Sequence, residues 1–179
     1  MKRLIPIRSK KDIPQEHKDT PIGRLFEYHN FERPREVYSE AQLLVGMCMD
    51  NRKHLHIPDN FSYIIRTGGA NMRYSEFKLS YAIGVGGVRH VALIGHDGCG
   101  MVDLVSRKEQ CIQGLIEGAG WERKAAEEHF DHFAPIFEIG DELDFVLNEA
   151  ERLRSRYPKI TIVPLMYLVD DGLLYMIKE

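Results

Sequence analysis

Cysteine is scarce in this sequence, and long apolar runs are missing. Only three cysteines occur among 179 residues, which excludes the disulfide framework of a small secreted domain. No stretch approaches the roughly 20 apolar residues that a membrane-spanning helix requires. The apolar segment that follows the first basic residues is also far too short for a signal peptide. We therefore expect a cytoplasmic protein without a membrane partner.

An excess of charge of one sign is missing too. The 24 Lys and Arg residues against 27 Asp and Glu give a formal net charge of −3, so no strong basic field attracts nucleic acid. We find no internal repeat and no low-complexity segment. A hydrophobic content of 44% is ordinary for a globular protein, and the length suits one domain with a substantial core.

Residues 1–38 are polar and rich in proline, with one short helix expected around residues 22–28. We predict that they form an N-terminal arm and that residues 39–179 form a single α/β domain that carries the function. Large apolar side chains of the arm gather in and after this helix, at Leu25, Phe26, Tyr28 and Phe31. A short helix cannot cover these side chains alone, so we expect the arm to contact a partner in a homodimer or an assembly of dimers.

Strand-like and helix-like patterns alternate after the arm. Apolar runs predict strands at residues 43–47, 61–66, 90–95, 160–169 and 173–177. Helical spacing predicts helices at about 74–85, 107–117, 121–132 and 141–156. This alternation indicates an α/β fold with a mostly parallel central sheet flanked by helices. Pro164 favours a bulge or an edge position for the fourth strand, and Asp170-Asp171-Gly172 predicts a hairpin turn into the last.

Two polar clusters directly follow predicted strands. The first is Cys48-Met49-Asp50-Asn51-Arg52, and the second is His96-Asp97-Gly98-Cys99-Gly100. An extended backbone would point Cys48, Asp50 and Arg52 to the same side, because strand side chains alternate faces. Thiolates, an imidazole and a carboxylate at neighbouring strand ends predict a zinc site. Open α/β sheets bind their ligands at this edge.

Other interpretations of the two clusters are weaker. A lone cysteine is usually a small buried hydrophobe, but here two cysteines and a histidine combine. A structural zinc usually has four protein ligands that include paired cysteines. Cys48, His96 and Cys99 supply three, so the fourth position falls to a carboxylate or water, which favours a catalytic metal. A cysteine phosphatase is excluded because neither cysteine is followed by an arginine six positions later.

The two clusters resemble the signature of the β-class carbonic anhydrases. That signature is Cys-x-Asp-x-Arg, followed some fifty residues later by His-x-x-Cys, and the matching residues here are Cys48, Asp50, Arg52, His96 and Cys99. Weaker similarity extends over about residues 40–178 and looks most like the compact prokaryotic form. The sequence departs from the family at Asn51, where serine is usual, and at residues 66–71, where Arg-Thr-Gly-Gly-Ala-Asn replaces Arg-Asn-Ala-Gly-Asn.

The resemblance implies a carbonate dehydratase, a zinc lyase that reversibly hydrates carbon dioxide to bicarbonate by zinc-bound hydroxide. It implies that Cys48, His96 and Cys99 bind Zn²⁺, that Asp50 and Arg52 are catalytic, and that the arm embraces a second copy. It also implies a closed state in which Asp50 leaves Arg52 and becomes a fourth ligand. Hydrolases of carbon disulfide or carbonyl sulfide share this scaffold and these ligands. They remain alternatives, as does a non-catalytic zinc-binding protein of this fold.

Several nearby residues carry less weight. Asp97 adjoins His96, but Asp favours helix N-termini, so we expect a capping or solvated role. His54 and His56 are placed to shuttle protons near neutral pH, although histidines in such a loop are more often plain surface residues. Three further residues are expected to be structural: His129 and His132 at the surface and Cys111 in buried packing.

Overall fold

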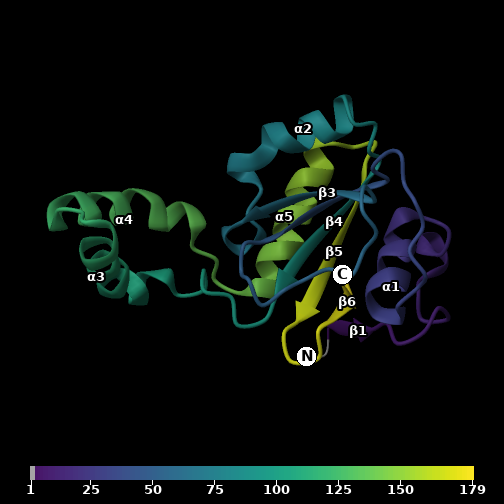
Figure 1. The fold of residues 1–179 in the computed structure, drawn as a ribbon, viewed down its shortest axis with the longest axis horizontal. Helices are drawn as coiled ribbons and strands as arrows, with labels where there is room; N and C mark the ends of the chain where they lie inside the picture. Colours follow the sequence, from purple (N-terminus) through teal and green to yellow (C-terminus); the bar gives the residue numbers. More distant parts are fainter. Residues whose placement is uncertain (1–2) are drawn as a thin grey trace.

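A six-stranded sheet lies at the centre of the protein, and the computed structural model describes residues 3–179 (Figure 1). The strands are β1 (Leu4–Pro6), β2 (Leu43–Cys48), β3 (Ser62–Thr67), β4 (His90–His96), β5 (Thr161–Leu168) and β6 (Leu173–Ile177). Their order is β1-β6-β5-β4-β2-β3. The four strands from β3 to β5 pair in parallel, whereas β6 pairs antiparallel with both β5 and β1. The expected mostly parallel sheet is confirmed.

Five α-helices accompany the sheet within the described residues. They are α1 (Pro21–Phe31), α2 (Glu76–Gly84), α3 (Lys108–Ala119), α4 (Arg123–Phe137) and α5 (Glu142–Arg156). Single 3-10 turns occur at Gln15–His17, Gly68–Ala70, Arg73–Ser75 and Leu104–Arg107. The four helices expected after the arm are present with small changes of boundary. Among residues 3–179 we find no helix with the length and apolar character needed to cross a bilayer.

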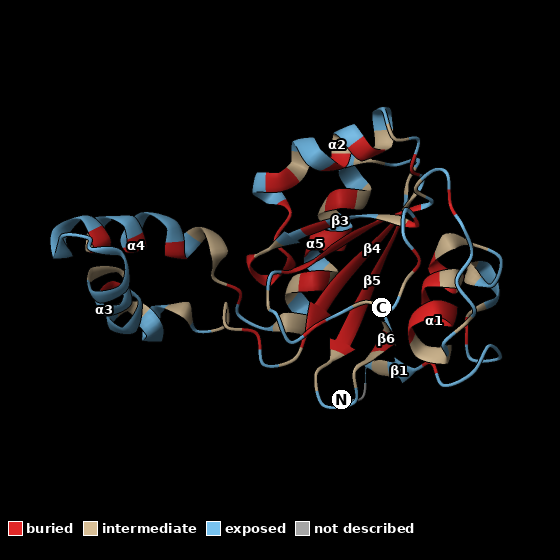
Figure 2. Cartoon of the chain, viewed as in Figure 1, coloured by how far each residue is buried: buried red, intermediate tan, exposed pale blue. Residues whose placement is uncertain are grey.

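Helices cover both faces of the sheet. Successive residues of a strand point to opposite faces, and here both sets are buried. Val45 and Ala92 belong to the core that contains α1, whereas Leu44 and Val91 belong to the core beneath α2 and α5. Figure 2 shows the central strands buried between these helices. This double cover explains why the parallel strands are continuous apolar runs in the sequence.

The N-terminal arm packs against its own sheet, which corrects our reason for expecting it to need a partner. Leu25, Phe26 and Tyr28 are buried within this chain, and Phe31 is partly buried. Asn30 fixes the position of α1, because its amide nitrogen donates to the carbonyl oxygens of Ile7 and Leu174 at 2.9 Å. The sequence of an amphipathic helix shows that the helix has an apolar face. It does not show whether the same chain or a second copy covers that face.

The edge position that Pro164 favoured for its strand is wrong. β5 lies inside the sheet, between β4 and β6, and Pro164 is paired in register with Leu93 of β4. The ladder with β6 begins only at Leu165. A proline lacks the backbone N–H that a residue of a central strand donates to one of its two neighbouring strands. Pro164 is tolerated because it lies just before the second ladder starts.

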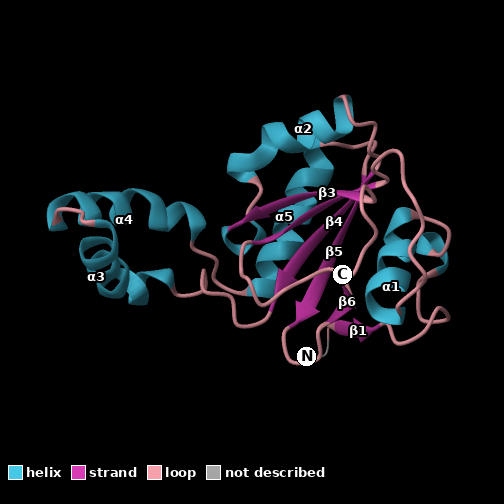
Figure 3. Cartoon of the chain, viewed as in Figure 1, coloured by secondary structure: helices cyan, strands magenta, loops and turns pink. Residues whose placement is uncertain are grey.

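The α3–α4 pair forms a helical hairpin that stands apart from the sheet (Figure 3). The segments that lead into and out of the hairpin meet at a single parallel bridge between Val102 and Ile139. Cys111, which we expected in buried packing, is exposed on α3. The expectation failed because this helix packs mainly against α4 and leaves most of its surface in solvent.

Candidate metal centre

The two polar clusters meet at the carboxyl ends of β2 and β4. These strands are parallel neighbours, and Met47 lies in register with Ile94. Cys48 is the last residue of β2, and His96 is the last residue of β4. The strand therefore ends before Asp50 and Arg52, so the alternation of an extended strand does not apply to them. A turn after Cys48 directs these two side chains instead.

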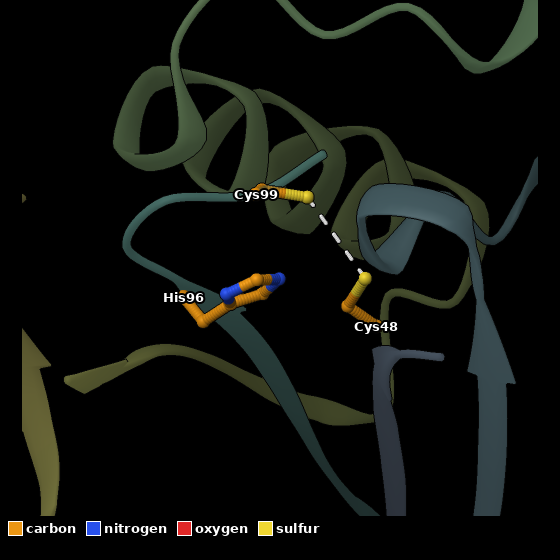
Figure 4. Close-up of side chains that lie close together, drawn as sticks. All are labelled: Cys48, His96 and Cys99. Atoms are coloured by element: carbon orange, nitrogen blue, oxygen red, sulfur yellow. Dashed lines mark hydrogen bonds between the residues drawn. The ribbon is translucent and has the colours of Figure 1, made fainter. Parts of the chain in front are cut away.

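Cys48, His96 and Cys99 form a compact buried triad whose ligand atoms all lie within 4.8 Å of one another. Figure 4 shows the three side chains converging on one point from the end of β2, the end of β4 and the loop after β4. The two sulfur atoms are 3.9 Å apart, far beyond the length of a disulfide bond. Gly98 helps to form the turn because it adopts a positive φ of 60°, a conformation that glycine accepts without strain.

The histidine of the triad is oriented as a metal ligand. His96 Nδ1 lies 2.8 Å from the carbonyl oxygen of Asp97, so this nitrogen carries the proton and donates it. Nε2 is then left with a lone pair, and it is buried without a hydrogen-bond partner among residues 3–179. Metal-binding histidines commonly hold their second nitrogen in this way. The unpartnered nitrogen is therefore available to coordinate a metal ion.

The two thiols share a proton. The hydrogen bond from Cys99 lowers the pKa of Cys48, helped by further hydrogen bonds from the backbone amides of Asp50 and Gly69. The same contact raises the pKa of Cys99, because this thiol is the donor. A buried pair that holds one anion readily and resists the second is well suited to a dication, which favours both thiolates.

The geometry of the triad fits tetrahedral zinc. Two sulfurs bound at a usual Zn–S distance of about 2.3 Å would lie about 3.8 Å apart, and the observed separation is 3.9 Å. Two thiolates and a neutral imidazole are also a donor set that zinc prefers. Cys48, His96 and Cys99 therefore fit the ion that the sequence implied.

Asp50 lies beside the triad and is held by Arg52. The Arg52 side chain donates from Nη2 to Oδ2 at 2.6 Å and from Nε to Oδ1 at 3.0 Å, and its backbone amide donates to Oδ1 at 2.9 Å. These hydrogen bonds hold the pKa of Asp50 well below its usual range, so the carboxylate stays ionised. Its Oδ2 is 3.9 Å from His96 Nε2. The two residues form a bidentate pair, and its carboxylate faces the ligands.

Three residues that support the site were not assigned roles from the sequence. Arg66 donates from its guanidinium to the carbonyl oxygens of Cys48 and Lys53 at 3.1 and 3.0 Å, which fixes the loop after β2. Glu142, at the start of α5, accepts from the backbone amide of Cys99 at 3.1 Å. Lys53 is completely buried next to Asp50. Arg66 drew attention only through the family resemblance, and no local pattern indicated the other two.

The weaker candidates lie outside the triad. Asp97 accepts a hydrogen bond from the backbone amide of Val169 at 2.7 Å, so it joins the ends of β4 and β5 rather than capping a helix. His54 and His56 are exposed on the loop after β2, and His56 donates through its backbone to His29 Nδ1. As expected, the last two histidines are exposed on α4, at His129 and His132.

An apolar groove of about 520 Å³ lies beside the site, between the body of the protein and the α3–α4 hairpin. Phe130, Phe133 and Phe137 line it from α4, and Gly68 and Met101 line it from the loops next to the triad. A side chain at Gly68 would come within 3.0 Å of the Met101 sulfur. The glycine therefore keeps this end of the groove open.

Comparisons with known proteins identify the fold. No protein-family model matches the sequence, and no curated protein matches it. A β-carbonic anhydrase structure from Trichomonas vaginalis is similar at a TM-score of 0.63 and 19% identity, covering 93% of this chain and 99% of that one. A carbonic anhydrase from Glaciozyma antarctica gives 0.61 and 20%, covering 92% and 99%. A carbon disulfide hydrolase gives 0.56 and 20%, covering 93% and 92%. The chain has the fold of these proteins, as the resemblance implied.

Proposed function

We propose that this chain is a β-class carbonic anhydrase, a zinc lyase that reversibly hydrates carbon dioxide to bicarbonate. The observation that carries the proposal is the buried triad of Cys48, His96 and Cys99 with an ionised Asp50 beside it. The charged Asp50 carboxylate lies 3.9 Å from His96 Nε2, the nitrogen assigned to the metal. The four-ligand site of a structural zinc does not require an ionised carboxylate there. A hydration reaction uses such a carboxylate, because the attacking water needs an acceptor for its hydrogen bond.

The residues of the site have separate roles in this reaction. Cys48, His96 and Cys99 would hold zinc, which supplies the Lewis acidity that makes water nucleophilic near neutral pH. Asp50 is ionised and can only accept, so it takes a hydrogen bond from the attacking water and directs the water's lone pair toward carbon dioxide. Arg52 orients Asp50 and keeps it charged. The apolar groove suits a small neutral substrate better than a charged one.

Stopped-flow measurement of carbon dioxide hydration tests the proposal. We expect zinc-loaded protein to accelerate hydration, with activity rising between about pH 7 and pH 8.5. Two anionic thiolates would make a bound zinc a weaker Lewis acid than three neutral histidines would, so activity should develop above the value of about pH 7 that suits a three-histidine site. A rate no faster than buffer across this range, for protein with one zinc per chain, would show that the assignment is wrong.

Carbon disulfide or carbonyl sulfide is the second candidate substrate. A carbon disulfide hydrolase shares the fold over 93% of this chain, and an apolar groove also suits these neutral molecules. The same zinc-loaded sample is therefore offered each substrate, and sulfide release is measured. Sulfide release without hydration of carbon dioxide would select this function. No turnover of any of the three would favour a non-catalytic zinc protein.

We also place the protein in the cytoplasm, as a homodimer or an assembly of dimers. The free thiols at Cys48 and Cys99 suit a reducing compartment. The support for a dimer is the edge strand β3 and the adjoining α2, which expose Tyr63, Ile64 and Phe77. An apolar sheet edge is a ready surface for a second copy related by a twofold axis. From the arm, the stretch after α1 is free to contribute, since Val37 is fully exposed.

Light scattering tests the assembly. We expect a mass of at least twice the 20.7 kDa of the chain at micromolar concentration. A double variant, Ile64→Lys with Phe77→Glu, should reduce the mass toward that of the monomer, because it places charges on the exposed apolar surface. Trp121→Glu, on the distant hairpin, is the matched control. A monomeric wild type would contradict the proposal.

A further inference from the structure

Lys53 is a buried cation that the proposed mechanism does not use. Its side chain has 0% exposure, and its Nζ has no hydrogen-bond partner among residues 3–179. Lysine is almost never fully buried unless it is paired, because removing an ammonium group from water is costly. Arg66 holds the backbone carbonyl of Lys53, so the position of this residue is fixed. A positive charge that is buried in a fixed position requires a nearby anion to offset the cost of its burial.

The carboxylate nearest to Lys53 is that of Asp50. Lys53 Nζ lies 3.7 Å from Asp50 Oδ1, whereas the other oxygen, Oδ2, lies 3.9 Å from His96 Nε2. Burial lowers the pKa of Lys53, and the negative charges of Cys48, Asp50 and Cys99 act against this by favouring the charged amine. The anions that act on Lys53 therefore all belong to the metal site, and its closest charged oxygen belongs to the residue that directs the attacking water.

Two cations of different character thus hold Asp50. The side chain of Arg52 is 48% exposed, so solvent and salt screen part of its attraction, and water can replace the carboxylate if the pair opens. Lys53 has no access to water, so moving Asp50 away would leave its charge with more distant partners. The buried cation makes departure of Asp50 more costly than Arg52 alone would.

Asp50 has a competing position. Its Oδ2 is 3.9 Å from a nitrogen that the proposed function assigns to the metal, so a small rotation would bring the carboxylate to the same ion. We infer that Lys53 is a positioning residue that holds Asp50 on Arg52 and keeps the fourth metal position open. This inference rests on the metal site of the proposed function, and it adds a residue whose side chain touches neither metal nor substrate.

The test is azide binding to the cobalt-substituted protein, followed by visible absorption. Azide needs the open fourth position, and a bound Asp50 would block it. We expect Lys53→Met to bind azide about tenfold more weakly than wild type, the scale of an ordinary coupling between sites. In an Asp50→Ala background, Lys53→Met should change azide affinity by no more than about twofold, because no carboxylate remains to close the site. Lys159→Met, an exposed lysine at the other end of the sheet, should match wild type.

The double-variant comparison separates positioning from simple attraction. If the charge of Lys53 merely attracts azide, the loss will be the same with and without Asp50, and the inference is wrong. Lys53→Arg keeps the charge and should restore azide affinity to within about twofold of wild type. If Lys53→Met binds no cobalt, Lys53→Gln replaces it. Failure of both neutral variants to bind cobalt would mean that Lys53 serves assembly of the site, which also contradicts the inference.

The results that would contradict the proposed function differ from those that would contradict the role of Lys53. A wild type that binds no cobalt would contradict the metal site itself. A wild type that binds cobalt and azide but does not hydrate carbon dioxide would contradict the activity and leave the role of Lys53 to be decided by azide affinity. Equal azide affinity in Lys53→Met and wild type would reject the role of Lys53 alone.

Discussion

Cys48→Ser and Cys99→Ser are each expected to lose zinc during purification, whereas Cys111→Ser should retain about one zinc per chain. A serine hydroxyl stays protonated where a thiol becomes a thiolate, so it cannot replace a sulfur ligand of the triad. We expect the affinity for zinc to fall by about 100-fold or more, since even the loss of a residue that hydrogen-bonds to a metal ligand can cost this much. Metal analysis and competition with a chromogenic chelator measure the loss.

Cys111 is a suitable control because it is exposed on α3, away from the triad. Circular dichroism should show that all three variants keep their helices. Full zinc content in a double variant, Cys48→Ser with Cys99→Ser, would contradict the assignment of the ligands.

Asp50→Asn is expected to retain zinc and to lose about 100-fold or more of the hydration rate, the usual cost of removing one aligned hydrogen-bond partner of a reacting group. The amide has the shape of the carboxylate, but it lacks the charge and can accept at only one atom. Arg52→Ala should lose activity for a related reason, because Asp50 is then free to approach the metal. Stopped-flow hydration with zinc content measured on the same samples checks both results.

Asp59→Asn changes an exposed aspartate on the loop after β2 and should leave the rate unchanged. If Asp50→Asn hydrates carbon dioxide at the rate of wild type, Asp50 does not direct the water. If Asp50→Asn loses zinc, its role is structural. Either outcome would require a different account of this carboxylate.

The sequence predicted the parallel sheet and the triad because both depend on local patterns. Continuous apolar runs indicate strands buried on both faces, and the polar residues directly after two of them mark the edge where ligands meet. The proximity of Cys48 and His96 then follows from the pairing of β2 with β4. The pairing of Asp50 with Arg52 came from the family resemblance, because the strand that would have placed both side chains on one side ends at Cys48.

The remaining features depend on contacts between distant segments. Lys53 is buried by the surrounding fold, although lysine is normally a surface residue. The apolar side chains of α1 pack on the protein's own sheet. Cys111 is exposed because the α3–α4 hairpin stands apart from that sheet. In each case the sequence showed the chemical character of the side chain and could not show which surface it would meet.

The most direct test of the account is a titration of metal-free protein with zinc, in which ¹⁸O exchange between labelled carbon dioxide and water is followed by mass spectrometry. The account predicts that exchange grows in proportion to added zinc and stops growing at about one zinc per chain, with no growth in a variant that carries both Cys48→Ser and Cys99→Ser. Wild-type protein that binds one zinc per chain and leaves the exchange rate at that of buffer would contradict it.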